Sequence, residues 1–195
     1  MTSTGASPQR LILVDPTDTV LGAMEREACH VGEGVLHRAF SILLFDSDGR
    51  VLLQQRSPHK RLWPGYWSNS CCGHPLVGEQ TDVAAQRRLG EELGIQTPLA
   101  PAFQFQYAAD FEDRGAEREL CSVFFGQHEG SVSPAADEIS DWGWESPRAL
   151  TDALLASPSR YTPWFRVIWR VIGLPASAWG ETDPEKNSGS RKSSN

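Results

Sequence analysis

The chain has 195 residues, of which 39% are hydrophobic and 22% are charged, and its formal net charge is −7. Such a composition is typical of an ordinary globular domain. No apolar run comes near the ~20 residues that a membrane span needs, and the polar start predicts no secretory signal. The acidic balance argues against nucleic acid as the main partner, although a locally basic site could still take an anionic small molecule. We therefore expect neither a membrane nor a nucleic-acid partner.

Four cysteines bear on the redox compartment: Cys29, Cys71, Cys72 and Cys121. Adjacent side chains of an extended strand point to opposite faces, so Cys71 and Cys72 are poorly placed to bridge each other. Together with the polar start, this favours free thiols over two disulfides. The sequence therefore predicts a cytoplasmic protein.

The chain alternates between strand and helix patterns. We expect strands at 11–14, 36–45, 51–56, 102–109, 117–125 and 142–144, and helices at 21–29, 81–93, 147–155 and 162–172. A hairpin turn is predicted at 46–49, a loop at 30–34 and a charged turn at 110–115. This order predicts an α/β (α+β) sandwich, with a mixed β-sheet and helices on both faces. We expect a flexible start at 1–9, one domain at 10–179 and a disordered polar tail at 180–195.

The stretch 69–95 carries the strongest helix signals. Thr81 is a suitable N-cap, Asp82 lies in the first turn, and Gly94 supplies a left-handed stop. One-turn spacing predicts that Arg87 pairs with Glu91, and that Arg88 pairs with Glu92. The buried stripe is expected to consist of Ala85, Leu89 and Leu93.

Three histidines and two glutamates form a candidate metal site. His30, His37 and His74 lie near turns and strand starts, and Glu117 and Glu119 are two apart in a strand, which directs both carboxylates to one face. Imidazoles with carboxylates suit a transition metal or zinc better than magnesium. The alternative is that each histidine is isolated and the glutamates are solvated.

The second candidate group is a thiol. Cys72 precedes Gly73 and His74 ahead of the helix at 81–93, where a dipole and cations can lower a cysteine pKa. The alternative is a buried, inert cysteine.

Basic and aromatic side chains complete the candidates. Arg56, Lys60 and Arg61 suit a diphosphate, unless they belong to a solvated loop. Trp164 and Tyr107 could line a pocket, where a π-face can stabilise a cation. The alternative for Trp164 is an ordinary core position in an apolar helix.

The helix region resembles the Nudix box, with Gly73, Glu79 and the run 87–95 at the spacing of that motif. Nudix hydrolases carry a glutamate where this chain has Arg88, and in them that carboxylate and the one a turn later, here Glu92, share metal ions. An arginine cannot ligate a metal. The resemblance therefore implies the Nudix scaffold without a complete hydrolytic metal cluster.

The whole arrangement resembles type I isopentenyl diphosphate isomerases. This resemblance implies a 1,3-proton shift between isopentenyl diphosphate and dimethylallyl diphosphate through a tertiary carbocation, in isoprenoid biosynthesis. It is carried by motifs at 30–40, 63–67, 69–75 (N-S-x-C-G-H-P), 92–94, 117–119 (E-x-E) and 162–164.

The resemblance also implies residue roles. Glu119 is the acid and Cys72 the base, on opposite faces of the substrate, while Tyr107 supports Glu119 and Trp164 faces the cation. One divalent metal, Mn²⁺, Zn²⁺ or Mg²⁺, is held by His30, His37, His74, Glu117 and Glu119.

The diphosphate end has its own implied residues. Glu92 and the Cys72 carbonyl bind a Mg²⁺ that bridges to the substrate diphosphate. Arg56 and Lys60 grip that diphosphate, and Arg26 falls where relatives often have lysine. The alternatives are a Nudix-type diphosphate hydrolase and a non-catalytic, metal-stabilised binding protein. The oligomeric state stays open, and a monomer is compatible with the sequence.

Overall fold

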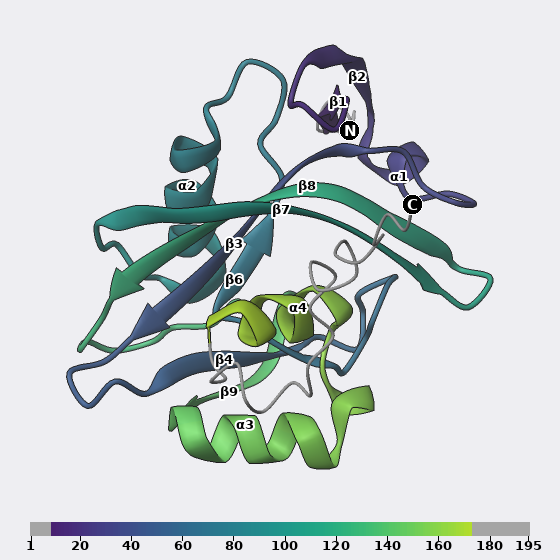
Figure 1. The fold of residues 1–195 in the computed structure, drawn as a ribbon. Helices are drawn as coiled ribbons and strands as arrows, with labels where there is room; N and C mark the ends of the chain where they lie inside the picture. Colours follow the sequence, from purple (N-terminus) through teal and green to yellow (C-terminus); the bar gives the residue numbers. More distant parts are fainter. Residues whose placement is uncertain (1–8, 173–195) are drawn as a thin grey trace, which may run out of the picture.

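The computed structural model describes residues 9–172, so the segments 1–8 and 173–195, with the predicted polar tail, lie outside the described residues (Figure 1). Its helices are α1 (Arg26–Cys29), α2 (Thr81–Leu93), α3 (Pro147–Ala156) and α4 (Pro163–Ile172), with a 3₁₀ turn at Pro158–Arg160. Its strands are β1 (Arg10–Val14), β2 (Val20–Glu25), β3 (His37–Phe45), β4 (Val51–Arg56), β5 (Trp67–Ser68), β6 (Cys71–Gly73), β7 (Leu99–Phe111), β8 (Gly115–Gln127) and β9 (Ile139–Glu145).

Strand β3 organises the sheet. It runs parallel to β8, in a register from His37↔Glu119 to Phe45↔Gln127, and antiparallel to β6, where Ser41 lies opposite Cys72. Strands β7 and β8 form a long antiparallel hairpin, and β4 pairs mainly with β9. Parallel and antiparallel pairs therefore coexist, which confirms the predicted mixed sheet.

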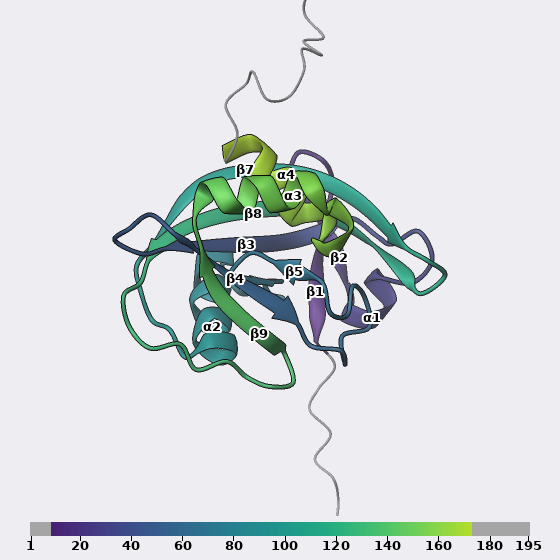
Figure 2. The same cartoon turned by 90° about the horizontal axis from the view of Figure 1, so that it is seen from below.

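Alternation along β3 divides the core into two layers. On one face Leu43 belongs to the cluster with Leu150 of α3 and Phe165 of α4. On the other face Ile42 belongs to the cluster with Leu89 of α2. Figure 2 shows α2 and the α3–α4 pair on opposite sides of the strands. Helices on both faces were predicted and are confirmed.

Helix α2 largely follows its predicted pattern. Ala85, Leu89 and Leu93 are fully buried, and the helix ends at Gly94 with a φ of 67°. Arg87 and Arg88 form the predicted ion pairs with Glu91 and Glu92. The N-cap prediction was wrong by one residue: Gln80 is the N-cap, its side chain makes no capping hydrogen bond, and Thr81 is the first helical residue.

The helix predicted at 21–29 is the main error in the secondary structure. Residues Val20–Glu25 form β2, which pairs antiparallel with β1, and only Arg26–Cys29 is helical. Pairing with a neighbouring strand here outweighs the local helical preference. Strands β7 and β8 are also longer than predicted because they pair with each other along their length. None of the helices in residues 9–172 is long and apolar enough to cross a membrane.

Candidate active site

A cavity of about 230 Å³ gathers the predicted site residues from distant parts of the chain. His37 is the one predicted site residue outside the lining, and it is fully buried with its Nε2 atom 3.7 Å from Glu119 Oε1. The sheet supplies one end of the cavity, and α1, α2 and the loop after β4 supply the other. The predicted residues in its lining are Arg26, His30, Arg56, Lys60, Arg61, Cys72, His74, Glu92, Tyr107, Glu117, Glu119 and Trp164.

The five predicted metal ligands meet at the sheet end. One potential ligand atom from each of them lies within 4.8 Å of all the others. The parallel register places His37 beside Glu119, and alternation along β8 puts Glu117 on the same face. His30 Nε2 lies 2.9 Å from Glu117 Oε2, and His74 Nε2 lies 2.8 Å from Glu119 Oε1.

Hydrogen bonds on the outer side of the cluster fix two of its imidazoles. The Nδ1 atoms of His30 and His37 lie 2.6 Å and 2.7 Å from the carbonyl oxygens of Arg26 and Val35. A carbonyl only accepts, so each Nδ1 carries the hydrogen and each Nε2 presents its lone pair to the cluster.

Two polar atoms of the cluster support a bound cation. With the hydrogens of His30 and His37 on Nδ1, His37 Nε2 and Glu117 Oε2 are buried without a hydrogen-bond partner in the described part of the chain, although His30 Nε2 lies 2.9 Å from Glu117 Oε2. Unsatisfied buried polar groups are costly, and a divalent cation at the centre would satisfy both. The donor set therefore fits a metal ion, and its mixture of imidazoles and carboxylates suits a transition metal or zinc.

Burial and mutual contacts set the charges in this cluster. Burial lowers the pKa of His74 to about 3, despite the neighbouring Glu119 carboxylate. Burial and the charge of Glu119 raise the pKa of Glu117. Against burial, the imidazoles of His37 and His74 hold the pKa of Glu119 well below its usual value. A neutral His74 beside an ionised Glu119 is suited to ligation.

The thiol of Cys72 lies in the same cavity. Its Sγ donates to Asn69 Oδ1 at 3.2 Å and lies 3.6 Å from Ser41 Oγ. Cys71, the neighbouring residue, is buried in the opposite layer against α2. The two thiols therefore point apart as predicted. All four cysteines are free, as also predicted.

Of the two possibilities for the Cys72 thiol, a pKa lowered by a dipole and cations or a buried cysteine, burial determines the direction of its pKa. Burial raises the pKa of this thiol, although hydrogen bonds to Ser41 and Asn69 and the charge of Arg56 oppose the rise. Helix α2 begins only at Thr81, so its positive end is separated from Cys72 by a loop. Desolvation of the thiolate therefore outweighs the stabilising groups.

Two aromatic side chains close the region around Glu119. Tyr107 lies opposite Glu119 in the β7–β8 hairpin and donates its hydroxyl to Glu119 Oε2 at 2.6 Å. Trp164 is buried and donates from Nε1 to Ser68 Oγ at 3.1 Å. Its ring lies 6.1 Å from that of Tyr107, centroid to centroid. Trp164 is thus a core residue that also forms a cavity wall.

Six basic side chains line the cavity, mostly from its helix and loop side, and four of them form a cluster in which the charges repel one another: Arg26, Arg56, Lys60 and Arg88. Arg56 also lies over the Trp164 ring, 5.3 Å from its centroid. Burial and the charge of Arg88 lower the pKa of Arg26. Burial lowers the pKa of Lys60 to about 8; Glu92 opposes this, while Arg56, Arg26 and Arg88 add to it. Positive charges crowded in this way favour an anionic ligand.

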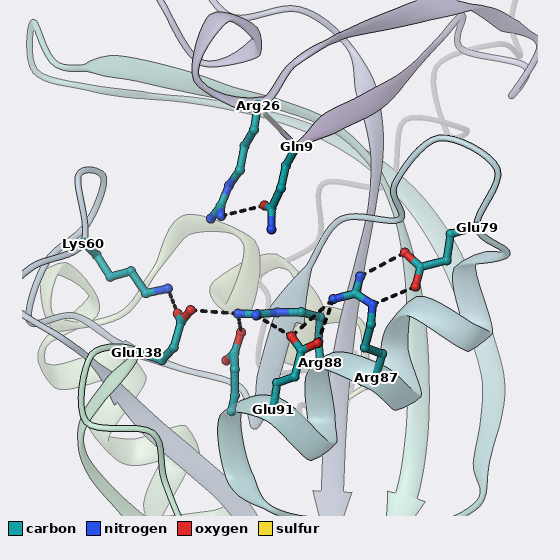
Figure 3. Close-up of polar contacts among 9 residues, drawn as sticks. Gln9, Arg26, Lys60, Glu79, Arg87, Arg88, Glu91 and Glu138 are labelled. Atoms are coloured by element: carbon teal, nitrogen blue, oxygen red, sulfur yellow. Dashed lines mark hydrogen bonds and ion pairs between the residues drawn. The ribbon is translucent and has the colours of Figure 1, made fainter. Parts of the chain in front are cut away.

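The four clustered cations have different hydrogen-bond and ion-pair partners (Figure 3). Arg26 contacts the Gln9 side-chain oxygen at 3.4 Å, and Arg56 donates to the backbone carbonyls of Leu62 and Trp63. The carboxylates of this region are gathered instead around Lys60 and Arg88. Lys60 pairs with Glu138, and Arg88 pairs with Glu91, Glu92 and Glu138.

Sequence reasoning did not identify several residues of this site. Ser41 and Asn69, which contact the thiol, and Glu138, which contacts two cations, were not singled out. Asn69 could have been found, because it begins the N-S-x-C-G-H-P motif that contains Cys72. Glu138 carries no local signal. Arg61, a predicted candidate, donates to the carbonyls of His30 and Arg114 and thereby ties two loops together.

The NUDIX domain family matches residues 35–165. The chain is 43% identical over 167 residues to the isopentenyl-diphosphate Delta-isomerase of Burkholderia multivorans, covering 86% of this chain and 94% of that protein. It is 41% identical over 160 residues to the protein of the same description from Nocardia farcinica, covering 82% and 91%.

Solved structures agree with the fold. The chain resembles the Deinococcus radiodurans protein DR0079 with a TM-score of 0.69 at 24% identity, covering 84% of this chain and 98% of that one. It resembles the MutT protein of Methanosarcina mazei with a TM-score of 0.57 at 20% identity, covering 70% and 91%. These likenesses support a Nudix fold for the sheet and helices described above.

Proposed function

This chain belongs to the isopentenyl-diphosphate Delta-isomerase family of NUDIX-domain proteins, and from this premise we propose how its cavity interconverts isopentenyl diphosphate and dimethylallyl diphosphate in isoprenoid biosynthesis. One observation carries the proposal. A thiol, a carboxylate and a cluster of four cations line one cavity. The hydrocarbon part of the substrate belongs between Cys72 and Glu119, and its diphosphate belongs among the cations.

Glu119 acts as the acid and Cys72 as the base. The carboxyl group of Glu119 gives a proton to the terminal alkene carbon, which leaves a tertiary carbocation. Cys72 Sγ then accepts a proton from C2, the allylic carbon that adjoins the cationic carbon. Enzymes commonly lower activation barriers by ~8–23 kcal/mol. Here most of that reduction must come from an acid and a base that are already positioned beside the alkene.

The protonation states of Cys72 and Glu119 after the forward reaction agree with the directions in which their pKa values are shifted in the free protein. After the forward reaction the thiol is protonated and the carboxylate is ionised. The raised pKa of Cys72 and the lowered pKa of Glu119 favour the same pattern in the free protein. One proton must therefore move from Cys72 to Glu119 before each forward cycle, and the free state already has the charges that the reverse reaction needs.

Tyr107 and Trp164 support the charged states of the cycle. The Tyr107 hydroxyl holds one Glu119 oxygen, which orients the carboxyl group toward the substrate. The indole face of Trp164 can stabilise a desolvated carbocation by about 2 kcal/mol. Because both rings are packed together in the lining, they also exclude water that would capture the cation.

His30, His37, His74, Glu117 and Glu119 would hold one divalent metal ion, and we propose Mn²⁺, Zn²⁺ or Mg²⁺. Such an ion supplies positive charge that tunes the proton affinity of the Glu119 carboxylate. The protein's own contribution is the fixed Nε2 orientation of His30 and His37.

Arg26, Arg56 and Lys60 bind the diphosphate, with charge-assisted hydrogen bonds as the main attraction. Glu92 and the Cys72 carbonyl would hold a Mg²⁺ that accompanies it. Glu92 is buried and pairs with Arg88 in this structure, so the guanidinium of Arg88 would share this carboxylate with the ion. A single domain at 10–179 and a cytoplasmic location stay predictions, and the oligomeric state stays open.

No observation in the described residues favours the alternative function, a Nudix-type diphosphate hydrolase. Where Nudix hydrolases have a metal-binding glutamate, Arg88 occupies the centre of three carboxylates, those of Glu91, Glu92 and Glu138. A guanidinium has no acceptor atom and cannot ligate a metal, so the hydrolytic cluster lacks one of its carboxylates.

The test is to incubate the chain with isopentenyl diphosphate and Mg²⁺ in D₂O and to follow the methyl signals by NMR. We expect dimethylallyl diphosphate carrying deuterium, and no phosphate release above the blank. Phosphate release without isomerisation would replace the proposal with the hydrolase.

A further inference from the structure

One carboxylate outside the cavity lining holds two of the four clustered cations. Glu138 contacts Lys60 Nζ, and it accepts from an Arg88 guanidinium nitrogen at 2.9 Å (Figure 3). Arg26 and Arg56 have no carboxylate partner in residues 9–172. Glu138 therefore distinguishes two members of the cation cluster from the other two.

The backbone around Glu138 is fixed on both sides. The Ser57 amide donates to the Glu138 carbonyl at 2.9 Å, and the next residue, Ile139, is buried and begins β9 opposite Arg56. Before it, the amides of Ser133 and Ala135 donate to the carbonyls of Leu93 and Glu92 at the end of α2. These bonds connect the Glu138 segment to β4 and α2, the elements that precede Lys60 and carry Arg88. The carboxylate is thus a fixed point between them.

The ammonium group of Lys60 requires a fixed ion-pair partner to stay at the cavity. Its ammonium is carried on a flexible four-carbon chain, and confining that chain costs conformational entropy. Other cations surround it, so repulsion favours positions away from the cavity. The side chains of Lys60, Arg88 and Glu138 are only 19%, 19% and 21% exposed, which makes their contacts less screened than those of a surface pair.

We propose that Glu138 is a positioning residue for diphosphate binding: it holds Lys60 and Arg88 at the cavity so that the substrate meets cations already in place. This inference rests on the proposed function, because the diphosphate is taken to bind among these cations. Glu138 is outside the cavity lining, so it acts through the two cations and does not contact the substrate.

The test measures binding of inorganic pyrophosphate with Mg²⁺ to the full chain by titration calorimetry. We expect Glu138→Gln to raise the Kd on the order of tenfold, because two charge-assisted contacts are lost, and Glu138→Asp to recover part of that loss. In turnover, KM for isopentenyl diphosphate should rise by a similar factor while kcat stays within about twofold. The matched control is Asp137→Asn, which removes the same charge from the exposed neighbouring residue and should leave the Kd within about twofold.

A double-mutant cycle separates positioning from a general effect. In a Lys60→Met background, Glu138→Gln should raise the Kd by a clearly smaller factor than in the wild-type chain. An equal factor in both backgrounds, an unchanged Kd with a lowered Tm, or tighter pyrophosphate binding would each overturn the proposal. Failure of the wild-type chain to isomerise isopentenyl diphosphate would instead refute the proposed function and leave the pyrophosphate comparison valid.

Discussion

The two ends of the cavity are built in different ways. At the sheet end, strand register sets the positions of His37 and Glu119, and backbone carbonyls fix the rings of His30 and His37. At the cation end, long side chains from the end of β4, the loop after it and two helices converge, and side-chain and backbone contacts hold them. Proton transfer requires precise placement, whereas attraction to a diphosphate tolerates small shifts. In the proposed mechanism, the rigid strands thus position the groups that transfer protons, and the flexible side chains bind the diphosphate.

The largest effect should come from the thiol. Replacing Cys72 by alanine removes the base, and we expect isomerisation to fall by about 10³-fold or more, within the usual range for a general acid or base. Cys71→Ala is the matched control, because Cys71 is buried in the layer against α2. NMR rates with isopentenyl diphosphate measure both. Equal losses in the two variants would contradict the assignment of the base.

A proposed metal ligand can be substituted without changing any of the four clustered cations. Glu117→Gln should weaken binding of the divalent ion about 100-fold, since it removes one of five converging ligands. Elemental analysis and the rise in Tm on adding Mn²⁺ or Zn²⁺ report this directly. Asp110→Asn, in the same hairpin but on an exposed side chain, should bind metal normally. Unchanged metal content in Glu117→Gln would refute the site.

The cation end should affect binding more than turnover. Lys60→Met removes a charge-assisted contact worth about 1.5–3 kcal/mol, so KM should rise about 10- to 100-fold with a small change in kcat. Arg50→Gln, in the exposed hairpin between β3 and β4, provides the control. A fall in kcat with KM unchanged would reverse the division between the two ends.

The smallest effect is expected at Trp164. Trp164→Leu keeps an apolar wall but loses the π-face, so kcat should fall about tenfold, and Trp164→Phe should recover part of it. Steady-state rates and Tm values should be measured together, because Trp164 also donates to Ser68 in the core. A loss of rate that matches the loss of stability in both variants would leave no role for the ring face.

The sequence predicted most of the fold because the deciding signals are local. The hairpin turn at 46–49, the apolar stripe of α2 and the Gly94 stop all depend on near neighbours. The β2 segment was mistaken for helix because its conformation is decided by pairing with β1. Strand alternation predicted that Glu117 and Glu119 share a face, which they do.

The parts of the site that sequence could not predict depend on long-range contacts. The pKa of Cys72 rises because the folded chain buries it, and neighbouring residue types do not reveal that burial. Glu138 reaches Lys60 and Arg88 only because backbone bonds tie its loop to α2 and β4. Neither fact has a counterpart in spacing or composition.

The most direct test of the division between the two ends is the structure of the metal-loaded Cys72→Ala variant with isopentenyl diphosphate bound. The account predicts the alkene between position 72 and the Glu119 carboxyl group, with the diphosphate against Arg26, Arg56 and Lys60. A diphosphate seated on the cluster of His30, His37 and His74, with the hydrocarbon chain directed at the cations, would contradict it.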